Sequence, residues 1–363
     1  MSDLKVLQRK ISRFITWFAV ITGAFTTMVM GQSMQERMNT AMDAGELSGL
    51  HATVVIFGGE QIAEAYFTGE DERWGTPIGI VEHGPDTLHD TRSITKSIIG
   101  LLYGIALDEG VVPELGTPLL DVFPEYSDLR DGSAREAITI ADVLTMQMGT
   151  EWDESLPYSD PRNSEIAMEL ADDRYRFVLD RPMVAEPGTV WTYNGGAVAL
   201  LAHLISKGSG MGIDTYAQTR IFDPLGISEF EWVAGADGVP SAASGLRLTA
   251  RDLAKVGAMV ARNGMYNGRQ IVPASWLDAS FQTRASITEG FNYGFLWYLA
   301  LGPNGDQLII ASGNGGQRLT VQPSVEFVVA TYAGRYNDFD SWQLPVRIIG
   351  EFAVPEVNRA RSE

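Results

Sequence analysis

The order of hydrophobic and polar positions predicts strands near both ends of the chain and helices between them. Residues 52–57 are apolar or β-branched, Gly58-Gly59 can form a tight turn and residues 61–67 return, which predicts a hairpin. Four segments near the C-terminus predict an antiparallel set of strands: residues 293–301, 307–311, 317–322 and 326–332. The terminal strands can share one sheet only if the middle of the chain is an inserted helical region. The predicted fold class is therefore α+β, an antiparallel sheet flanked by helices with an inserted, mainly helical lobe.

Helical periodicity is strongest over residues 91–108, where apolar residues recur on one stripe and Gly110 can end the helix. Further helices are predicted over residues 34–44, 138–146, 197–206, 250–262 and 341–352. Thr249 is the expected N-cap of the helix over 250–262. No internal repeat, low-complexity tract or linker divides the chain. We therefore predict one catalytic unit over residues 32–355, followed by a short tail over residues 356–363.

The first 31 residues have the pattern of an export segment. Four basic residues precede residues 14–30, a run of 17 residues without charge. Short residues before Gln32 complete the layout of a secretory signal. The same run is just long enough to span a bilayer, so an uncleaved membrane anchor is the alternative, and a buried helix of a cytosolic protein is the third. Export predicts a location in the periplasm or on the inner membrane facing it, and N-terminal sequencing that begins near Gln32 would show cleavage.

Composition limits the chemistry that the chain can perform. A net charge of −19 argues against a nucleic-acid partner and indicates a solvated acidic surface, with salt adaptation as the alternative. The absence of cysteine excludes disulfides, thiolate nucleophiles and cysteine-based metal sites. His51, His83, His89 and His203 show no metal-ligand spacing along the sequence, so we predict no metal or cofactor. Neither a Gly-x-Ser-x-Gly elbow nor a phosphate-binding glycine loop is present.

A Ser-x-x-Lys sequence, with Ser93 and Lys96, begins the predicted 91–108 helix. A spacing of three places both side chains on one helix face, and Asp90 or Thr91 is the expected cap. Unpaired N–H groups and the positive end of the helix dipole favour an anion near Ser93. A serine hydroxyl is a weak nucleophile until a base takes its proton, and a buried lysine with a lowered pKa can assist. The spacing alone is weak evidence, because residues 2–5 match it and a capped helix with a surface lysine gives the same pattern.

Several other segments accompany this sequence in a fixed order. They include residues 87–97 around Ser93, Leu-Thr-Met-Gln-Met-Gly at 144–149, Glu-Pro-Gly-Thr at 186–189, Pro-Leu-Gly-Ile at 224–227 and Ser-Gly-Leu at 244–246. Together with the Asn263-Gly264 turn and Trp276, these segments resemble class C β-lactamase-like serine hydrolases, of the penicillin-binding protein and β-lactamase-related superfamily. The similarity covers roughly residues 34–353. It implies a serine β-lactamase or D,D-peptidase-like fold, no cofactor and a covalent acyl-enzyme on Ser93.

In that family a tyrosine opens the second motif, and Trp-Thr-Tyr-Asn-Gly-Gly at 191–196 is similar to it. The resemblance implies that Tyr193, as a phenolate stabilised by Lys96, takes the Ser93 proton and passes it to the leaving group. The family has Asn two residues after the tyrosine, but here Gly195 occupies that position and Asn194 lies one residue early. Asn194 is therefore expected either to bind substrate or simply to form a tight turn.

The third motif of the family has Lys or His, a small residue and Gly on an edge strand. Ser-Gly-Asn-Gly-Gly-Gln at 312–317 offers Asn314 in place of the cation, with Gly315 and Gly316 able to let substrate lie against the strand. A hairpin turn alone is the alternative. The resemblance implies an oxyanion hole made by the N–H groups of Ser93 and Gln317.

A loop over residues 157–164 is expected to lie over the site. It contains Tyr158, Asp160 and Asn163. Related hydrolases of short amides, such as aminohexanoate oligomer hydrolases, use a tyrosine from a comparable loop. The resemblance therefore implies that Tyr158 binds substrate.

The predicted function is hydrolysis of a small-molecule or peptide ester or amide. Loss of the cation at Asn314 weakens attraction to the carboxylate that penicillins and D-Ala-D-Ala peptides carry, which favours an esterase or amidase. A D,D-peptidase or β-lactamase is the alternative enzyme, and a catalytically weak module that binds cell-envelope peptides is the alternative of another class. The departures at Gly195 and Asn314 favour the binding module, whereas Ser93, Lys96 and Tyr193 together favour the enzyme. The oligomeric state is left open.

Overall fold

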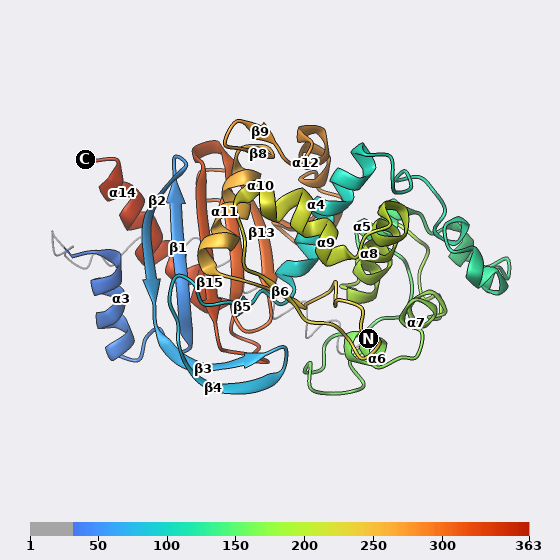
Figure 1. Ribbon diagram of the computed structural model, residues 1–363, viewed down its shortest axis with the longest axis horizontal. Coiled ribbons are helices and arrows are strands. Elements are labelled where there is room, and N and C mark those ends of the chain that lie inside the picture. The colour runs from blue at the N-terminus through green and yellow to red at the C-terminus, as the bar shows by residue number, and fades with distance from the viewer. Residues whose placement is uncertain (1–31, 363) are drawn as a thin grey trace.

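The computed structural model describes residues 32–362, and the predicted export segment, residues 1–31, lies outside this range. A large antiparallel sheet occupies one side of the molecule and a mainly helical lobe the other (Figure 1). The sheet has eight strands in the order β10-β11-β12-β13-β14-β15-β1-β2. These strands are β1 (Leu50–Phe57), β2 (Glu60–Tyr66), β10 (Ala285–Thr288), β11 (Phe291–Tyr293), β12 (Tyr298–Leu301), β13 (Gln307–Gly313), β14 (Gln317–Gln322) and β15 (Phe327–Ala333).

Strands from the N-terminal and C-terminal parts of the chain pair within this sheet, next to its β2 edge. Strand β1 pairs with both β15 and β2, so the blue and red strands lie side by side in Figure 1. The predicted hairpin is confirmed, and Gly58 and Gly59 have φ of 58° and 86°, as a two-residue hairpin turn requires. Helices α4 (Ile94–Asp108) to α12 (Ala274–Ser280) lie between β2 and β10 in sequence, which confirms the α+β fold with an inserted helical lobe.

The C-terminal strands are confirmed with one difference. The segment predicted as a single strand over 293–301 forms two paired strands, β11 and β12, because the chain turns between them. Phe295, Leu296 and Trp297 in that turn are buried. The apolar run therefore belongs to a core-filling turn, which a pattern of buried residues cannot distinguish from a strand.

Polar segments form small sheets that the hydrophobic pattern does not reveal. They are β3 (Thr68–Arg73) with β4 (Thr76–Glu82), β5 (His89–Asp90) with β7 (Leu246–Leu248) and β6 (Glu231–Trp232), and β8 (Met265–Tyr266) with β9 (Arg269–Gln270). Strand β5 leads directly into the Ser93 segment, and β3 and β4 lie below the large sheet in Figure 1.

The helices confirm most of the predicted set. They are α3 (Met34–Asp43), α4 (Ile94–Asp108), α5 (Ile140–Leu144), α6 (Ser164–Glu169), α7 (Arg174–Leu179), α8 (Gly195–Ser209), α9 (Ile213–Ala217), α10 (Asp223–Leu225), α11 (Ala250–Ala261), α12 (Ala274–Ser280), α13 (Gln343–Ile348) and α14 (Val354–Ala360). Short 3-10 or π segments are η1 (Leu119–Asp121), η2 (Pro124–Leu129), η3 (Ala134–Ala137), η4 (Gln218–Phe222), η5 (Pro323–Val325) and η6 (Ile349–Ala353). Thr249 caps α11 as predicted, accepting a hydrogen bond from the Asp252 N–H.

The C-terminal residues form a helix that packs against the rest of the domain. Helix α14 includes much of the predicted tail, residues 356–363, and Glu356 is 2% exposed. Its carboxylate lies 2.7 Å from the Arg37 guanidinium on α3. Val357 joins an apolar cluster with Met38 and Phe352. The helical chain therefore continues past the predicted boundary at residue 355 and packs into this second core.

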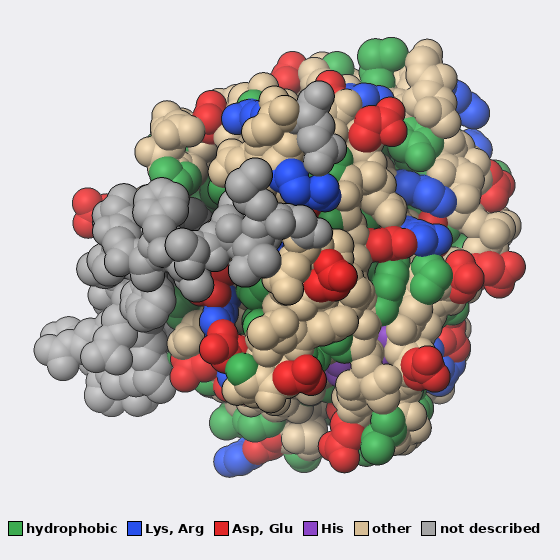
Figure 2. Space-filling model, turned by 90° about the vertical axis from the view of Figure 1, so that its left-hand side faces the viewer, with side chains coloured by type: hydrophobic (Ala, Val, Ile, Leu, Met, Phe, Trp, Pro, Cys, Tyr) green, Lys and Arg blue, Asp and Glu red, His purple; other side chains and the backbone are tan. Residues whose placement is uncertain are grey.

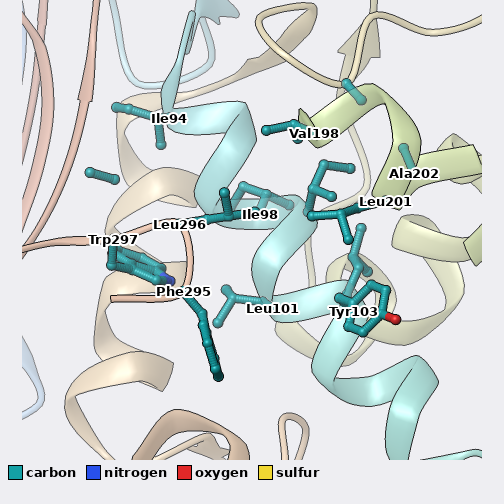
Figure 3. Close-up of a cluster of buried hydrophobic side chains, with 14 of the residues drawn as sticks. Ile94, Ile98, Leu101, Tyr103, Val198, Leu201, Ala202, Phe295, Leu296 and Trp297 are labelled. Atoms are coloured by element: carbon teal, nitrogen blue, oxygen red, sulfur yellow. The ribbon is translucent and has the colours of Figure 1, made fainter. Parts of the chain in front are cut away.

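Helix α4 runs through the main core (Figure 3). Ile98 and Leu101 are fully buried between side chains of α8 and the Phe295–Trp297 turn. A Cβ at Gly104 would lie 2.1 Å from the Trp276 ring, so α12 approaches α4 closely at this glycine. Close packing on all sides fixes the axis of α4 and therefore the position of Ser93 at its N-terminal end.

Many of the acidic side chains lie on the surface of the molecule. On the face in Figure 2, Asp and Glu side chains are dispersed with Lys and Arg between them. Exposed pairs such as Arg347 with Glu46 and Glu351 contribute about 0–1 kcal/mol each. Among residues 32–362 no single helix has the length and apolarity needed to cross a membrane, although the bent pair Gly195–Ser209 and Ile213–Leu225 passes on length and composition together.

Candidate active site

Ser93 is the N-cap residue of α4 and is 8% exposed. Its side chain makes no capping hydrogen bond, and the expected caps are wrong: the Thr91 hydroxyl donates to the Leu246 carbonyl, while Asp90 pairs with Arg247. Arg92 has φ of 50°, a left-handed conformation that costs free energy in a residue with a side chain. The hydroxyl is therefore held at the helix end by the backbone and free of a capping role.

Lys96 is 1% exposed and contacts Ser93, so it is not a surface lysine. Its Nζ lies 3.1 Å from the Ser93 Oγ, 2.9 Å from the Glu165 Oε2 and 2.9 Å from the Ala243 carbonyl oxygen. An ammonium has three hydrogens, and three acceptors surround this one. In this arrangement Lys96 is a hydrogen-bond donor to Ser93 and has no lone pair with which to accept its proton.

Tyr193 lies beside this pair, with the Lys96 Nζ 4.9 Å from the centre of its ring. Burial, and then repulsion by the Glu154 carboxylate, raise the pKa of Tyr193 well above its usual value, while hydrogen bonding with the Ser93 hydroxyl lowers it less. The resting side chain is therefore a neutral phenol. Low polarity and nearby carboxylates both disfavour a phenolate in the resting site, and the role of Tyr193 in taking the Ser93 proton stays a prediction.

The third-motif segment is a hairpin turn that also adjoins the nucleophile. A Cβ at Gly313, the last residue of β13, would lie 2.6 Å from the Thr91 carbonyl oxygen and 2.9 Å from the Arg92 Cβ. Gly315 and Gly316 have φ of 100° and 97°, which favour glycine. The end of β13 and the start of α4 are therefore in direct contact, as a shared substrate site requires.

Comparison with known proteins identifies the family. The family model described as Beta-lactamase matches residues 34–343. The chain belongs to the Beta-lactamase family. It is therefore a member of the serine hydrolase superfamily, and the resemblance noted in the sequence is confirmed.

Individual relatives of this Beta-lactamase family chain are distant. It is 24% identical over 301 residues to the 6-aminohexanoate-dimer hydrolase of Paenarthrobacter ureafaciens, covering 77% of this chain and 71% of that protein. A solved Bacillus anthracis protein, proposed to be a 6-aminohexanoate-dimer hydrolase, aligns with a TM-score of 0.71 and 21% identity over 87% of this chain and 81% of the other. A family VIII carboxylesterase aligns with a TM-score of 0.63 and 16% identity over 89% and 96%. These structural likenesses show a shared fold.

The departure from the family pattern at Gly195 has a structural counterpart in Glu165. A Cβ at Gly195 would lie 2.4 Å from the Glu165 Oε2, the oxygen that accepts from Lys96. Glu165 is 1% exposed, and its other oxygen accepts a hydrogen bond from the Ser244 hydroxyl at 2.8 Å. A buried carboxylate therefore fills the space beside the position where the family has Asn, and it is the partner of Lys96. Sequence reasoning missed Glu165, because no motif marks this acidic residue at the start of a short helix.

Asn163 and Asn194 have supporting roles in the structure. Asn163 is fully buried and accepts from the Glu165 N–H, which places Glu165 at the start of α6. Asn194 is 2% exposed, and its Oδ1 caps α8 by accepting from the Ala197 N–H at 3.0 Å. The capping bond supports the turn interpretation of Asn194 over the substrate-binding one.

Tyr158 reaches the site through Glu154, a second carboxylate that sequence reasoning missed. The Tyr158 hydroxyl donates to the Glu154 Oε2 at 2.8 Å, while the Trp152 indole and the Gly195 N–H each donate to the Oε1 at 2.6 Å. Glu154 and Tyr193 both contribute to raising the pKa of Tyr158 above its usual value, after burial. The loop over residues 157–164 therefore lies against the site as expected, although Asp160 in it pairs with Arg162.

Asn314 does not present a free amide. Its Nδ2 donates to the Asn337 Oδ1 at 3.1 Å, and its Oδ1 accepts from the Asn337 N–H at 2.9 Å. The Tyr158 N–H also donates to the Asn337 Oδ1. Asn314 therefore ties the third-motif turn to the Tyr158 loop. Gln317 is fully buried and its side chain bonds both backbone groups of Ala333, while an oxyanion role for its N–H stays a prediction.

Ionisation of Glu154 should appear in the pH dependence of hydrolysis. Burial, followed by repulsion from Glu165, raises the pKa of Glu154 to about 7, against the attraction of Lys96. When Glu154 ionises, its carboxylate adds negative charge beside Tyr193. Because the transition state develops further negative charge at the same place, ionisation of Glu154 should slow the reaction. Taking Glu154→Gln as the matched neutral variant, we expect the ratio of wild-type to variant kcat/KM to be constant below about pH 6 and to fall roughly tenfold as the pH rises through 7. A ratio that stays flat from pH 5 to 9 would show that Glu154 does not titrate in this range.

Proposed function

We propose that the protein hydrolyses an ester or amide through a covalent acyl-enzyme on Ser93. The observation that carries this proposal is the buried Lys96 Nζ, 3.1 Å from a Ser93 hydroxyl that stands at the N-terminal end of α4. Tyr193 adjoins both residues. A nucleophile, a cation and a proton carrier are thus brought together without any cofactor in the proposed reaction.

The first step transfers the acyl group to Ser93. The Ser93 Oγ bonds to the substrate carbonyl carbon, and the carbonyl electrons move to the oxygen. The N–H groups at the start of α4 stabilise that oxyanion. The Ser93 proton passes to the Tyr193 oxygen while the phenol gives its own proton to the leaving oxygen or nitrogen, so an alcohol or amine departs. Lys96, as an ammonium, stabilises negative charge on the Ser93 oxygen throughout.

The second step returns the enzyme to its starting state. Water bonds to the acyl carbon, and its proton moves through Tyr193 to the Ser93 oxygen as the ester bond to Ser93 breaks. The carboxylic acid leaves, and every proton taken up in the first step has been returned. Because Tyr193 only exchanges one proton for another, this route is compatible with a phenol whose pKa is high.

An ester or simple amide fits the site better than a β-lactam. The amide of Asn314 occupies the family's cation position and is bonded to Asn337. A substrate carboxylate therefore gains no charge attraction from this side chain. Relatives that share the fold include a carboxylesterase and a 6-aminohexanoate-dimer hydrolase, which supports the same choice.

Substrate preference is measurable with two chromogenic compounds. We expect the wild-type protein to cleave p-nitrophenyl acetate or butyrate with kcat/KM at least about tenfold above that for a chromogenic cephalosporin. The Ser93→Ala variant is the control for uncatalysed and surface-catalysed hydrolysis, and it should lose the ester activity. Efficient cephalosporin turnover without ester cleavage would favour the β-lactamase instead. Saturable binding of both compounds, with wild-type rates no higher than those of the control, would favour a peptide-binding module.

A further inference from the structure

Three of the four histidines, separated along the chain, meet at one buried point of the fold. His51 comes from β1, His83 follows β4 and His89 lies in β5, and Asp71 of β3 joins them. Each of the four side chains is buried, with at most 6% exposure. One nitrogen or oxygen from each lies within 4.8 Å of all the others. The histidines show no metal-ligand spacing along the sequence, and strands far apart in the chain bring three of them together in space.

The hydrogen bonds around the cluster direct lone pairs toward its centre. The Nδ1 of His89 lies 3.0 Å from the Asp90 carbonyl oxygen, so it donates there and leaves the Nε2 as an acceptor. His51 also hydrogen-bonds the Glu70 backbone, while its Nδ1 faces the His89 Nε2 at 2.9 Å. Without a metal, the His51 Nδ1 can donate to the His89 Nε2, whereas the other neutral tautomer of His51 directs both lone pairs to a shared cation. Backbone bonds of this kind orient histidines that bind metals.

The other two atoms that could bind a metal have no hydrogen-bond partner among the described residues. The His83 Nε2 and the Asp71 Oδ2 are buried without a hydrogen bond, 3.9 Å apart. The Asp71 Oδ1, in contrast, accepts from the Tyr336 hydroxyl at 2.7 Å and from the Glu72 N–H at 2.9 Å. A buried polar atom without a partner destabilises the fold, and a metal ion would offset that cost at both atoms.

We infer that His51, His83, His89 and Asp71 form a binding site for Zn²⁺ or a similar divalent transition-metal ion. Three imidazoles and one carboxylate are a normal zinc ligand set, and four protein ligands leave no open position for a substrate. Zinc–nitrogen bonds of about 2.0–2.1 Å place tetrahedral ligand atoms roughly 3.3 Å apart. The His51 Nδ1 and the His89 Nε2 lie 2.9 Å apart and no two of the four atoms are more than 4.8 Å apart, so metal binding requires the widest pairs to close by up to about 1.5 Å. Burial also lowers the pKa of all three histidines, which keeps the rings neutral at pH 7 and able to bind a metal.

The role that follows is structural, at the base of the active site. His89 lies four residues before Ser93. Tyr336, which holds Asp71, also packs against Gly315 in the third-motif turn, and the Arg92 guanidinium lies 4.7 Å from its ring centre. A metal here would join β1, β3, β5 and the segment after β4, and so brace the backbone that presents Ser93.

Metal content and spectroscopy test this inference independently of activity. Full-length protein is purified, treated with a chelator and dialysed, and then given Zn²⁺ or Co²⁺. We expect about one metal ion per chain, visible d–d absorption typical of tetrahedral Co²⁺, and a higher thermal midpoint with Zn²⁺. The Asp71→Asn and His83→Gln variants should lose the Co²⁺ spectrum and the thermal shift. Asp71→Asn retains an oxygen for Tyr336 and Glu72, so it is the variant most compatible with the metal-free fold.

The matched control is His203→Gln, which changes the one histidine outside the cluster. His203 packs between Phe123 and Tyr175 and should leave metal binding as in the wild type. Absence of bound metal, of a Co²⁺ spectrum and of a thermal shift in the wild type would overturn the inference and leave a neutral, hydrogen-bonded histidine cluster. Equal binding by wild type, Asp71→Asn and His83→Gln would also overturn it, because the metal would then lie elsewhere.

Discussion

Replacement of Lys96 by Ala should lower kcat/KM for an ester substrate by at least about 10²–10⁴-fold, the range of a group that assists proton transfer and charge stabilisation. The ammonium contacts the Ser93 oxygen directly and has no exposed surface through which a solvent cation could replace it. Its loss also leaves the Glu165 carboxylate buried beside the forming alkoxide. Steady-state kinetics on p-nitrophenyl butyrate would measure the change. Lys255→Ala is the control, since that lysine bonds Asp252 on α11.

Tyr193→Phe should lose a similar 10²–10⁴-fold, because the ring remains but the proton route does not. The Lys96→Ala/Tyr193→Phe double variant should have a kcat/KM only slightly below that of the less active single variant, since the effects of groups that act as one unit are not additive. Near-normal activity of Tyr193→Phe would remove this residue from the mechanism. Losses that multiply in the double variant would show that the two residues act in separate steps.

Breaking the Lys96–Glu165 pair should produce the largest change in stability. Both side chains are at most 2% exposed, and loss of one member leaves the other as an uncompensated buried charge. We expect Glu165→Leu to lower the free energy of unfolding by about 3–5 kcal/mol, measured by denaturant titration. The Lys96→Met/Glu165→Leu variant removes both charges and should recover most of that loss, although it should be inactive.

An exposed pair provides the control for this comparison. Glu351→Ala breaks a surface contact with Arg347 and should change the free energy of unfolding by less than about 1 kcal/mol. If the losses of unfolding free energy caused by Lys96→Met and by Glu165→Leu simply add in the double variant, the two groups are not coupled. The account of a mutually dependent buried pair would then be wrong.

Elements with a long, regular pattern were predictable from the sequence. Strand β14 matches its predicted range, α11 begins at its predicted cap, and α4 ends as Gly110 suggested, because each is specified by local periodicity and capping. The turn around Trp297 was missed because a buried turn and a buried strand are equally apolar. Helical spacing brings Ser93 and Lys96 together, and the accompanying segments distinguished this pair from a capped helix with a surface lysine.

Residues whose role depends on distant contacts were not predictable. Glu165 and Glu154 are unremarkable acidic positions until the fold brings the first to Lys96 and the second to the Gly195 N–H. His51, His83 and His89 lack any ligand spacing in sequence because each comes from a different strand or loop. The raised pKa of Tyr193 could not be predicted for the same reason, since it depends on burial and on carboxylates far away in the chain.

The central claim, acylation of Ser93, is tested most directly by intact-mass analysis after exposure to a fluorophosphonate, followed by peptide mapping. The account predicts a single adduct on the wild-type protein that maps to Ser93 and is absent from Ser93→Ala. An adduct that persists in Ser93→Ala at another residue, or a wild-type protein that remains unlabelled while folded, would contradict it.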